Sequence, residues 1–140
     1  MFIVFGVYVL SVSEKIIPNS MVGMMIILHG LGTWVAGYFP MDKDPYTNSP
    51  SFRCKIHFWA GLAMLLSLLI APALICTSSI YPTWFRIFSV VCILGNIIFT
   101  LILLKAYKAK SKIGFHQRLS YGFQILWILV FSFVVKNGYR

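Results

Sequence analysis

The sequence predicts an all-α integral membrane protein, a helical bundle with four full transmembrane helices and a short N-terminal one. Of the 140 residues, 59% are hydrophobic and 11% are charged, with a mean hydropathy of +0.85, whereas soluble domains average about 25% charged residues. The apolar residues also form four long stretches. Each has roughly the length that crosses a ~30 Å hydrocarbon core at 1.5 Å per residue. These stretches are 21–39, 57–75, 84–104 and 119–135.

Charge is nearly absent from these four stretches. They contain a single charged residue, Arg86, which lies near one end of its stretch. An ionised side chain at the centre of a membrane helix costs about 2.5–3.5 kcal/mol on insertion scales, so the pattern favours hydrocarbon as the solvent. Because the linkers are short, we expect residues 1–140 to form one bundle with no separate soluble domain.

The first segment is shorter than the other four. Residues 1–12 are apolar, but twelve helical residues cover only about 18 Å, so we predict a partial first span. The segment has no basic start and no small-residue cleavage site, and a cleaved signal peptide is not expected. Asn19 or Ser20 is expected to cap the next helix.

Basic residues are concentrated in two linkers. The net charge is +9, from 12 basic and three acidic residues, and linkers 40–56 and 105–118 hold eight of the basic ones. The positive-inside rule therefore predicts that both linkers are cytoplasmic, in a plasma membrane. Because the charges flank membrane spans, the expected partners are anionic membrane lipids and not nucleic acid. The other four basic residues are Lys15, Arg86, Lys136 and Arg140.

Small residues mark the expected packing faces. Gly23, Gly30 and Gly37 recur every seven residues, and Gly32 with Ala36 adds a second pair of small residues. Lipid removes the hydrophobic drive for helix association and leaves van der Waals packing, which small residues favour. We expect an intramolecular packing face here, with a dimer interface as the alternative. Stretches 21–39 and 57–75 should pack as an antiparallel hairpin through such faces.

Among the polar residues inside the spans, three stand out: His29, Asn96 and Gln124. Asn96 needs a hydrogen-bond partner at mid-membrane, which Gln124, Tyr121 or His29 is expected to supply. We interpret these residues as interhelical hydrogen-bonding groups. The alternative is the lining of a polar path, formed with the other polar residues of the stripe, Ser89 and Thr100.

Six polar residues flank the spans on the predicted cytoplasmic side and are expected to form a ligand-binding site at that rim. Ionisable groups that converge at a membrane edge are a functional-site hypothesis by default. The alternative is structural, with Asp42 paired to Arg118 and His57 serving a helix N-terminus. No catalytic residue is assigned. The six are Asp42, Asp44, His57, His116, Gln117 and Arg118.

Several short motifs occur in a fixed order: Gly37-Tyr38-Phe39-Pro40-Met41-Asp42, then Ile56-His57, then Gly114-Phe115-His116-Gln117-Arg118. This order resembles a prokaryotic membrane-protein family catalogued only as a domain of unknown function, over about residues 21–132. The resemblance implies that the polar positions of the family are Asp42, His57, Gln117 and Arg118. It also implies about six spans, so a partner protein or a second copy is expected to complete the bundle.

The main functional hypothesis is a small non-catalytic membrane subunit or lipid-associated module that binds an anionic group at the cytoplasmic rim. One alternative is a metal-dependent intramembrane hydrolase that uses Asp42, His57 and His116, since zinc accepts these ligand types. Their spacing resembles the alkaline ceramidase and adiponectin-receptor superfamily, although its full histidine set is missing. A further alternative is an oligomeric transporter or channel. No cofactor is predicted, and only the hydrolase hypothesis needs a metal.

Overall fold

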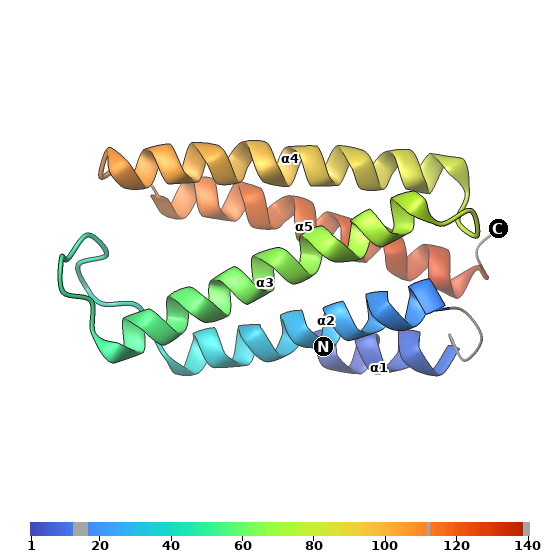
Figure 1. The fold of residues 1–140 in the computed structure, drawn as a ribbon, viewed down its shortest axis with the longest axis horizontal. Helices are drawn as coiled ribbons and strands as arrows, with labels where there is room; N and C mark the ends of the chain where they lie inside the picture. The colour runs from blue at the N-terminus through green and yellow to red at the C-terminus, as the bar shows by residue number, and fades with distance from the viewer. Residues whose placement is uncertain (13–16, 112, 139–140) are drawn as a thin grey trace. The chain divides into compact units, whose positions relative to one another are not determined.

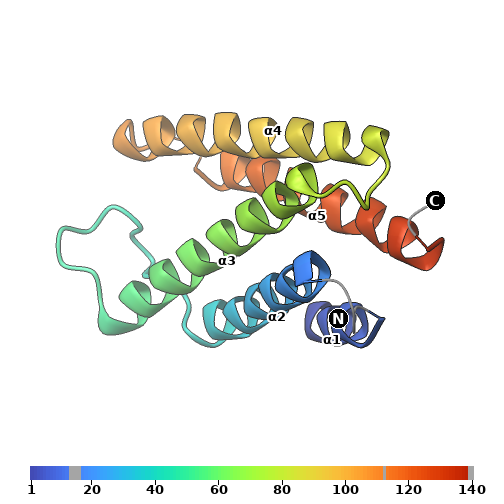
Figure 2. The same ribbon diagram turned by 45° about the vertical axis from the view of Figure 1, so that its right-hand side comes forward.

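The computed structural model describes residues 1–12, 17–111 and 113–138, which leaves Lys15, Lys112 and Arg140 outside the described part. This part of the chain is all-helical (Figures 1 and 2) and confirms the predicted fold class. Four helices are long and apolar enough to cross a membrane, which identifies an integral membrane protein with a short N-terminal helix. The helices are α1 (Phe2–Val12), α2 (Ile17–Tyr38), α3 (Phe52–Thr77), α4 (Thr83–Lys108) and α5 (Ile113–Lys136).

Each long helix begins before the apolar stretch that predicted it, and all but α2 also end after it. Hydropathy marks the part of a helix that suits hydrocarbon, whereas backbone hydrogen bonding continues into the polar ends. Arg53 and Lys55 therefore lie in the first turn of α3. Because α2 begins at Ile17, Asn19 and Ser20 lie inside that helix, and the prediction that one of them caps it is wrong.

The chain divides into two compact units, residues 1–71 (unit 1) and residues 72–140 (unit 2). The division falls inside α3 at Pro72, and the helix continues through this proline. Proline removes a backbone N–H donor and crowds the carbonyl group four residues earlier, here that of Leu68. The boundary thus coincides with the weakest point in the hydrogen-bonding ladder of α3.

In unit 1, α1 packs closely against α2 through glycine. A Cβ atom added to Gly6 would lie 2.8 Å from the carbonyl oxygen of Gly23, and one added to Gly30 would lie 2.7 Å from Cγ1 of Ile3. The predicted intramolecular glycine face is therefore confirmed at Gly23 and Gly30, where its partner is α1. The third glycine of the repeat, Gly37, has no neighbouring heavy atom within 4 Å of an added Cβ.

The opposite side of α2 meets α3. His29 contacts the carbonyl group of Met64, Gly32 lies against Met64 and Ala60, and the carbonyl group of Ala36 contacts His57. Positions on α2 thus rise as their partners on α3 fall, and the predicted antiparallel hairpin is confirmed. Gly30 and Gly32 serve different neighbours because two helical residues are about 200° apart around the axis.

Unit 2 is built on the antiparallel pair α4 and α5. A Cβ atom on Gly95 would lie 2.6 Å from the ring of Phe123, so this glycine gives the ring its space. Toward the other end of the pair, the ring of Phe131 stacks at centroid distances of 5.0 Å on Trp127 and 6.0 Å on Phe85. Trp127 is 1% exposed, so it is a packed residue.

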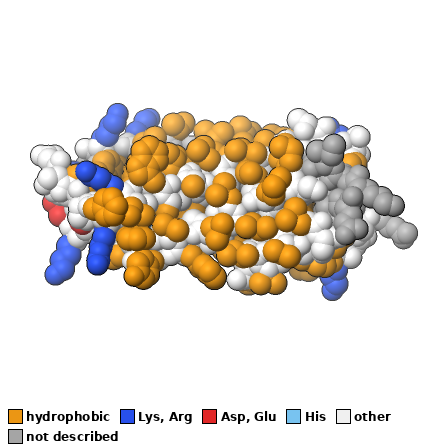
Figure 3. Space-filling view, turned by 60° about the horizontal axis from the view of Figure 1, so that its bottom comes forward, with side chains coloured by type: hydrophobic (Ala, Val, Ile, Leu, Met, Phe, Trp, Pro, Cys, Tyr) orange, Lys and Arg blue, Asp and Glu red, His pale blue; other side chains and the backbone are white. Residues whose placement is uncertain are grey.

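The outward surface is strongly apolar. On the face drawn in Figure 3, hydrophobic side chains cover the helices between their ends, and lysine and arginine side chains lie toward the ends. Large side chains such as Trp34 and Trp59 are 72% and 66% exposed. Exposed apolar surface on this scale marks an interaction surface in a soluble protein, and here it is the surface that membrane helices present to lipid.

The glycine contacts predict different outcomes for two identical substitutions on α2. Gly30→Ala should lower the free energy of unfolding by about 1–3 kcal/mol, because the added methyl group overlaps Ile3 and forces α1 away. Gly37→Ala should be neutral or slightly stabilising, because its methyl group enters open space and alanine favours the helix. Thermal unfolding in detergent measures both. Equal stabilities for the two variants would show that the α1–α2 glycine contact does not matter.

Candidate functional site

Asp42 ties the loop between α2 and α3 to the start of α3. Its carboxylate accepts hydrogen bonds from the hydroxyl group of Ser51 at 2.5 Å and from the backbone N–H of Ser51 at 2.8 Å. The oxygen of the same hydroxyl accepts a bond from the backbone N–H of Cys54 at 3.2 Å, so Ser51 acts as the N-cap of α3. The hydroxyl and then the backbone N–H of Ser51 hold the pKa of Asp42 below its ordinary value of 3.8.

The second acidic residue of this loop has a local role. The carboxylate of Asp44 accepts the backbone N–H of Tyr46 at 2.9 Å, which is the pattern of an Asx turn. Both aspartates of the predicted site are thus bonded to their own loop. The same region also contains three basic residues, Lys43, Arg53 and Lys55. In the described structure, these residues do not form a turn or a helix cap of this kind.

His57 serves the C-terminal end of α2. Its Nδ1 atom lies 2.9 Å from the carbonyl oxygen of Ala36 and 2.9 Å from that of Phe39. Because a carbonyl oxygen can only accept, Nδ1 carries the proton and donates to both. The last carbonyl groups of a helix lack partners within the helix, and His57 satisfies one of them, that of Ala36, together with the carbonyl group of Phe39, which directly follows the helix. The expectation that His57 serves a helix N-terminus is therefore wrong, because His57 serves the C-terminal end of α2.

The other three predicted site residues open α5 in unit 2. Gln117 and Arg118 are exposed, and His116 is half-buried. Within the described chain, Nδ1 of His116 is buried without a hydrogen-bond partner. Asp42, Asp44 and His57 belong to unit 1, so convergence of all six residues on one site stays a prediction.

The described residues contain no preformed cluster of metal-ligand side chains. Nowhere in ranges 1–12, 17–111 and 113–138 do three or more histidine, cysteine, aspartate or glutamate side chains gather closely enough to hold one ion. Asp42 and the Nδ1 atom of His57 are also engaged by Ser51 and by the carbonyl groups of α2.

The turn between α4 and α5 concentrates positive charge. Lys105 and Lys108 lie in the last turn of α4, where cations interact favourably with the helix dipole. The side chains of Lys105, Lys108, Lys110 and Arg118 are exposed. Residues 72–140 contain no aspartate or glutamate, so unit 2 has no acidic group of its own to offset them. We call these four residues the basic turn.

Lys110 adopts a backbone conformation that is uncommon for lysine. Its φ is +51°, which lies in the left-handed region. The N–H of Lys110 bonds to the carbonyl group of Tyr107 and that of Ser111 to Ala106, the two bonds of a Schellman motif. Glycine is the usual residue at this position, and other residues cost about 1–2 kcal/mol there. The chain carries a lysine at this strained position.

His29 and Asn96 each make a hydrogen bond within their own unit, although the side-chain nitrogen of Asn96 is buried without a partner in the described structure. His29 is fully buried, and its Nδ1 atom donates to the carbonyl oxygen of Met64 at 3.2 Å. The side-chain oxygen of Asn96 accepts hydrogen bonds from Ser120 and from Thr100, each at 3.2 Å. The Asn96–Ser120 bond joins α4 to α5, as expected of an interhelical hydrogen bond. Gln124 is 3% exposed on the same pair of helices.

Two partners were missed at the sequence level. Ser120 lies one helical turn from Gln124, on the same face of α5, and that helical spacing was the available signal. Ser51 follows a proline and precedes an apolar run, which is an N-terminal capping pattern. It was missed because the apolar stretch was taken to begin at His57.

The indole of Trp127 is also bonded across the pair. Its N–H donates to the hydroxyl oxygen of Ser89 at 2.8 Å, and that hydroxyl donates to the carbonyl oxygen of Phe85 at 2.9 Å. Tryptophan has one side-chain donor and needs a partner for it when buried. Ser89 therefore fixes the ring at the centre of the aromatic stack with Phe131.

Replacing the partner of Trp127 should destabilise unit 2. Ser89→Ala leaves the indole N–H buried without an acceptor, at a cost of about 1–3 kcal/mol in the free energy of unfolding. Ser132→Ala is the matched control, because that hydroxyl bonds to the Leu129 carbonyl of its own helix. Thermal unfolding and tryptophan fluorescence measure the difference. A Ser89→Ala protein as stable as the Ser132→Ala protein would contradict the assigned role.

The loop contact of Asp42 predicts a local effect. Asp42→Asn should speed amide hydrogen exchange at Ser51 and Cys54. The two bonds from Ser51 use both carboxylate oxygens of Asp42, whereas asparagine has only one acceptor oxygen. Asp44→Asn is the control, since asparagine also forms Asx turns. Unchanged exchange in Asp42→Asn would show that the Asp42–Ser51 contact does not hold this loop in place.

The same contact has a defined pH dependence. Because the pKa of Asp42 is lower in the folded chain than its ordinary value of 3.8, the ionised carboxylate stabilises the fold above that pH. The contribution is lost as the pH falls through the folded pKa. Carboxyl ¹³C NMR should therefore give Asp42 a midpoint below 3.8, and a midpoint at or above it would be inconsistent with these bonds.

Comparison with known proteins gives a family and no activity. No curated protein and no solved structure matches the chain. A family model described as "Protein of unknown function (DUF998)" matches residues 1–134. The match includes α1 and so starts earlier than the predicted resemblance over residues 21–132. The individual motifs and a prokaryotic origin stay predictions. With nearly its whole length matched, the chain belongs to the DUF998 family.

Proposed function

We propose that this chain is a small non-catalytic integral membrane protein whose basic turn binds the anionic head groups of membrane lipids. In this role it is a subunit or a lipid-associated module, completed by a membrane-protein partner or a second copy. The observation that carries the proposal is the basic turn at one end of the α4–α5 pair, in a unit whose sequence has no acidic residue.

Electrostatics supports lipid head groups as the ligand. A lysine or arginine near an anionic leaflet contributes about 1 kcal/mol of attraction, so the exposed members of the basic turn together contribute several. Arg118 can also bind a phosphate through two parallel hydrogen bonds, which a lysine cannot do. These groups follow directly on apolar helices, at the level where head groups begin.

The strained backbone of Lys110 adds independent support. Residues held in uncommon backbone regions cluster at binding and active sites. A glycine at this position would relieve the strain but would remove a charge from the basic turn. The side chain of Lys110 is exposed, so its charge faces the surroundings of the turn.

The distribution of charge supports an orientation. Linkers 40–56 and 105–118 together carry most of the basic residues. The acidic residues of linker 40–56 are bonded within their own loop. By the positive-inside rule, both linkers face the cytoplasm, as in a protein of the bacterial inner membrane.

No observation favours the alternatives. A hydrolase would need Asp42, His57 and His116 on one metal ion, but among the described residues no three such side chains gather closely enough to hold one. A transporter would need Ser89, Asn96 and Thr100 to line a path. In the described structure these polar groups contact Trp127 and Ser120 across the α4–α5 pair.

The proposal is tested by removing the charge of three lysines in the basic turn. Lys105→Gln, Lys108→Gln and Lys110→Gln together should weaken retention of phosphatidylglycerol by roughly a hundredfold at low salt, from about 1 kcal/mol per lysine. The matched control replaces the same three lysines with arginine, which keeps the charge. The measurement is the amount of phosphatidylglycerol that remains with the full chain after extraction from mixed phosphatidylcholine–phosphatidylglycerol vesicles.

The outcome separates charge from packing. Retention in the arginine variant but not in the glutamine variant supports the proposal, and added salt should reduce the difference. If the glutamine variant retains phosphatidylglycerol as well as the unmodified chain, the basic turn does not bind head groups.

A further inference from the structure

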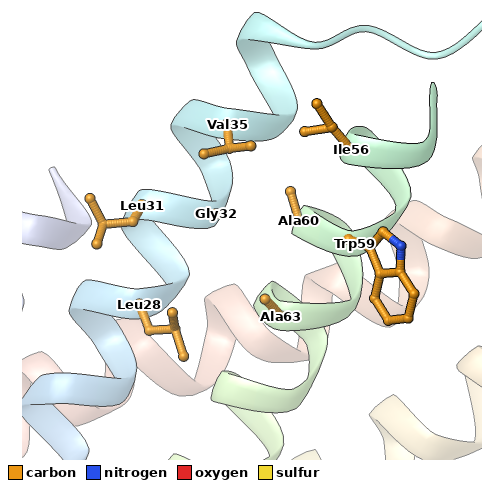
Figure 4. A pocket seen from close by; sticks show the side chains of 8 residues that line it. All are labelled: Leu28, Leu31, Gly32, Val35, Ile56, Trp59, Ala60 and Ala63. Carbon is orange, nitrogen blue, oxygen red and sulfur yellow. The ribbon is translucent and has the colours of Figure 1, made fainter. Parts of the chain in front are cut away.

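An apolar groove of about 310 Å³ lies between α2 and α3 in unit 1. Figure 4 shows its lining residues on the two helices, with Leu28 and Val35 on α2 and Ile56, Ala60 and Ala63 on α3 near the space between them. All of the lining residues are apolar or glycine. They are Leu28, Leu31, Gly32, Val35, Ile56, Trp59, Ala60 and Ala63.

The groove exists because the two helices meet through small residues. A Cβ atom on Gly32 would lie 2.6 Å from Cγ of Met64 and 3.2 Å from the carbonyl oxygen of Ala60, so the backbones are close at this point. Beside this contact, Ala60 and Ala63 are too short to fill the space that the larger wall residues enclose. The result is an apolar groove on the surface of unit 1.

Two cations lie in the first turn of α3, before its groove-lining residues. Arg53 lies one helical turn before Ile56, and Lys55 lies one turn before Trp59, so each shares a side of α3 with a lining residue. Both cations are exposed. Helix α3 begins at Phe52 and contains no acidic residue, so the dipole at its N-terminus adds to the positive potential there.

We propose that this groove binds one acyl chain of an anionic glycerophospholipid, whose phosphate lies against Arg53 and Lys55. The inference rests on the proposed association with anionic lipid but assigns a discrete site in unit 1, away in sequence from the basic turn. The acyl chain packs against Ala60 and Ala63, and the arginine supplies a bidentate contact to the phosphate. Trp59, 66% exposed, has the amphipathic ring typical of head-group depth.

Charge favours a lipid over a second copy of the chain as the occupant. In a two-fold dimer through this face, the same surface of each subunit meets its equivalent. If both copies cross the membrane in the same direction, their Arg53 and Lys55 side chains approach one another, and like charges repel. An anionic lipid instead brings a negative head group to the same place, with a hydrocarbon chain that suits the lining.

Native mass spectrometry of the full chain tests the site, with phosphatidylglycerol and phosphatidylcholine of identical acyl chains as probes. Ala63→Leu extends a side chain into the groove and should lower phosphatidylglycerol retention about tenfold. Gly61→Leu is the matched control, because an added Cβ there meets no heavy atom within 4 Å, and it should retain lipid as the unmodified chain does. Helical content by circular dichroism confirms that each variant is folded.

A second variant tests the head-group end without changing the groove. Arg53→Gln with Lys55→Gln should reduce the preference for phosphatidylglycerol over phosphatidylcholine by about thirtyfold. Both side chains are exposed, so this variant keeps the fold even if Ala63→Leu does not.

Three results would overturn the site. They are unchanged retention in Ala63→Leu, equal losses in Ala63→Leu and Gly61→Leu, and a dimer that Ala63→Leu dissociates with no change in bound lipid. Failure here is distinguishable from failure of the proposed function, because the lysine variants of the basic turn leave the groove intact. Loss of one lipid in Ala63→Leu with no effect of the basic-turn variant would keep the groove site and reject the proposed function.

Discussion

Hydrocarbon offers no hydrogen bonds, and this property of the solvent decides where the neutral polar groups of the chain lie. Three of them find partners inside their own units: Nδ1 of His29 on a carbonyl group of α3, the side-chain oxygen of Asn96 on Ser120, and the indole N–H of Trp127 on Ser89. Among the described residues, the side-chain nitrogen of Asn96 and Nδ1 of His116 are buried without a partner. An unpaired group in the membrane core would cost several kcal/mol. The same rule extends to the span ends, where Nε of Arg86 donates to the carbonyl oxygen of Cys76 at 3.0 Å near the C-terminal end of α3.

Lipid in place of water as the solvent also changes which interactions hold the helices together. Because lipid is as apolar as a leucine side chain, association depends on close packing, and α2 achieves it on two sides with different glycines. Gly23 and Gly30 admit α1, whereas Gly32 admits α3. Packing of this kind is local, and the groove begins where small side chains continue without a neighbour that fills their space. The close contact and the groove thus have the same cause, which is the run of small residues in the sequence.

Span length and hydropathy were enough to predict the number and kind of helices, because the bilayer imposes a simple length requirement. They could not predict partners. A seven-residue glycine repeat defines a face of α2 but not which helix meets it, and α1 was not expected there. The capping role of Ser51 was hidden because the polar first turn of α3 carries no hydropathy signal. The left-handed backbone at Lys110 had no signal at all, since glycine is the residue that normally marks it. The six-residue rim site combined residues of both units, which sequence cannot place together.

The two charge signs are used differently in this chain. Asp42 and Asp44 set the geometry of one loop through Ser51 and Tyr46, so their negative charge is committed to the fold. The lysines and arginines of both linkers outnumber them, and unit 2 has no acidic residue. Neutral polar groups are therefore explained by packing and acidic groups by loop structure, while the cations at the helix ends are not explained by either. Their placement directly beside apolar helices, together with the left-handed backbone of Lys110, is the basis of the proposal that an anionic membrane surface is their partner.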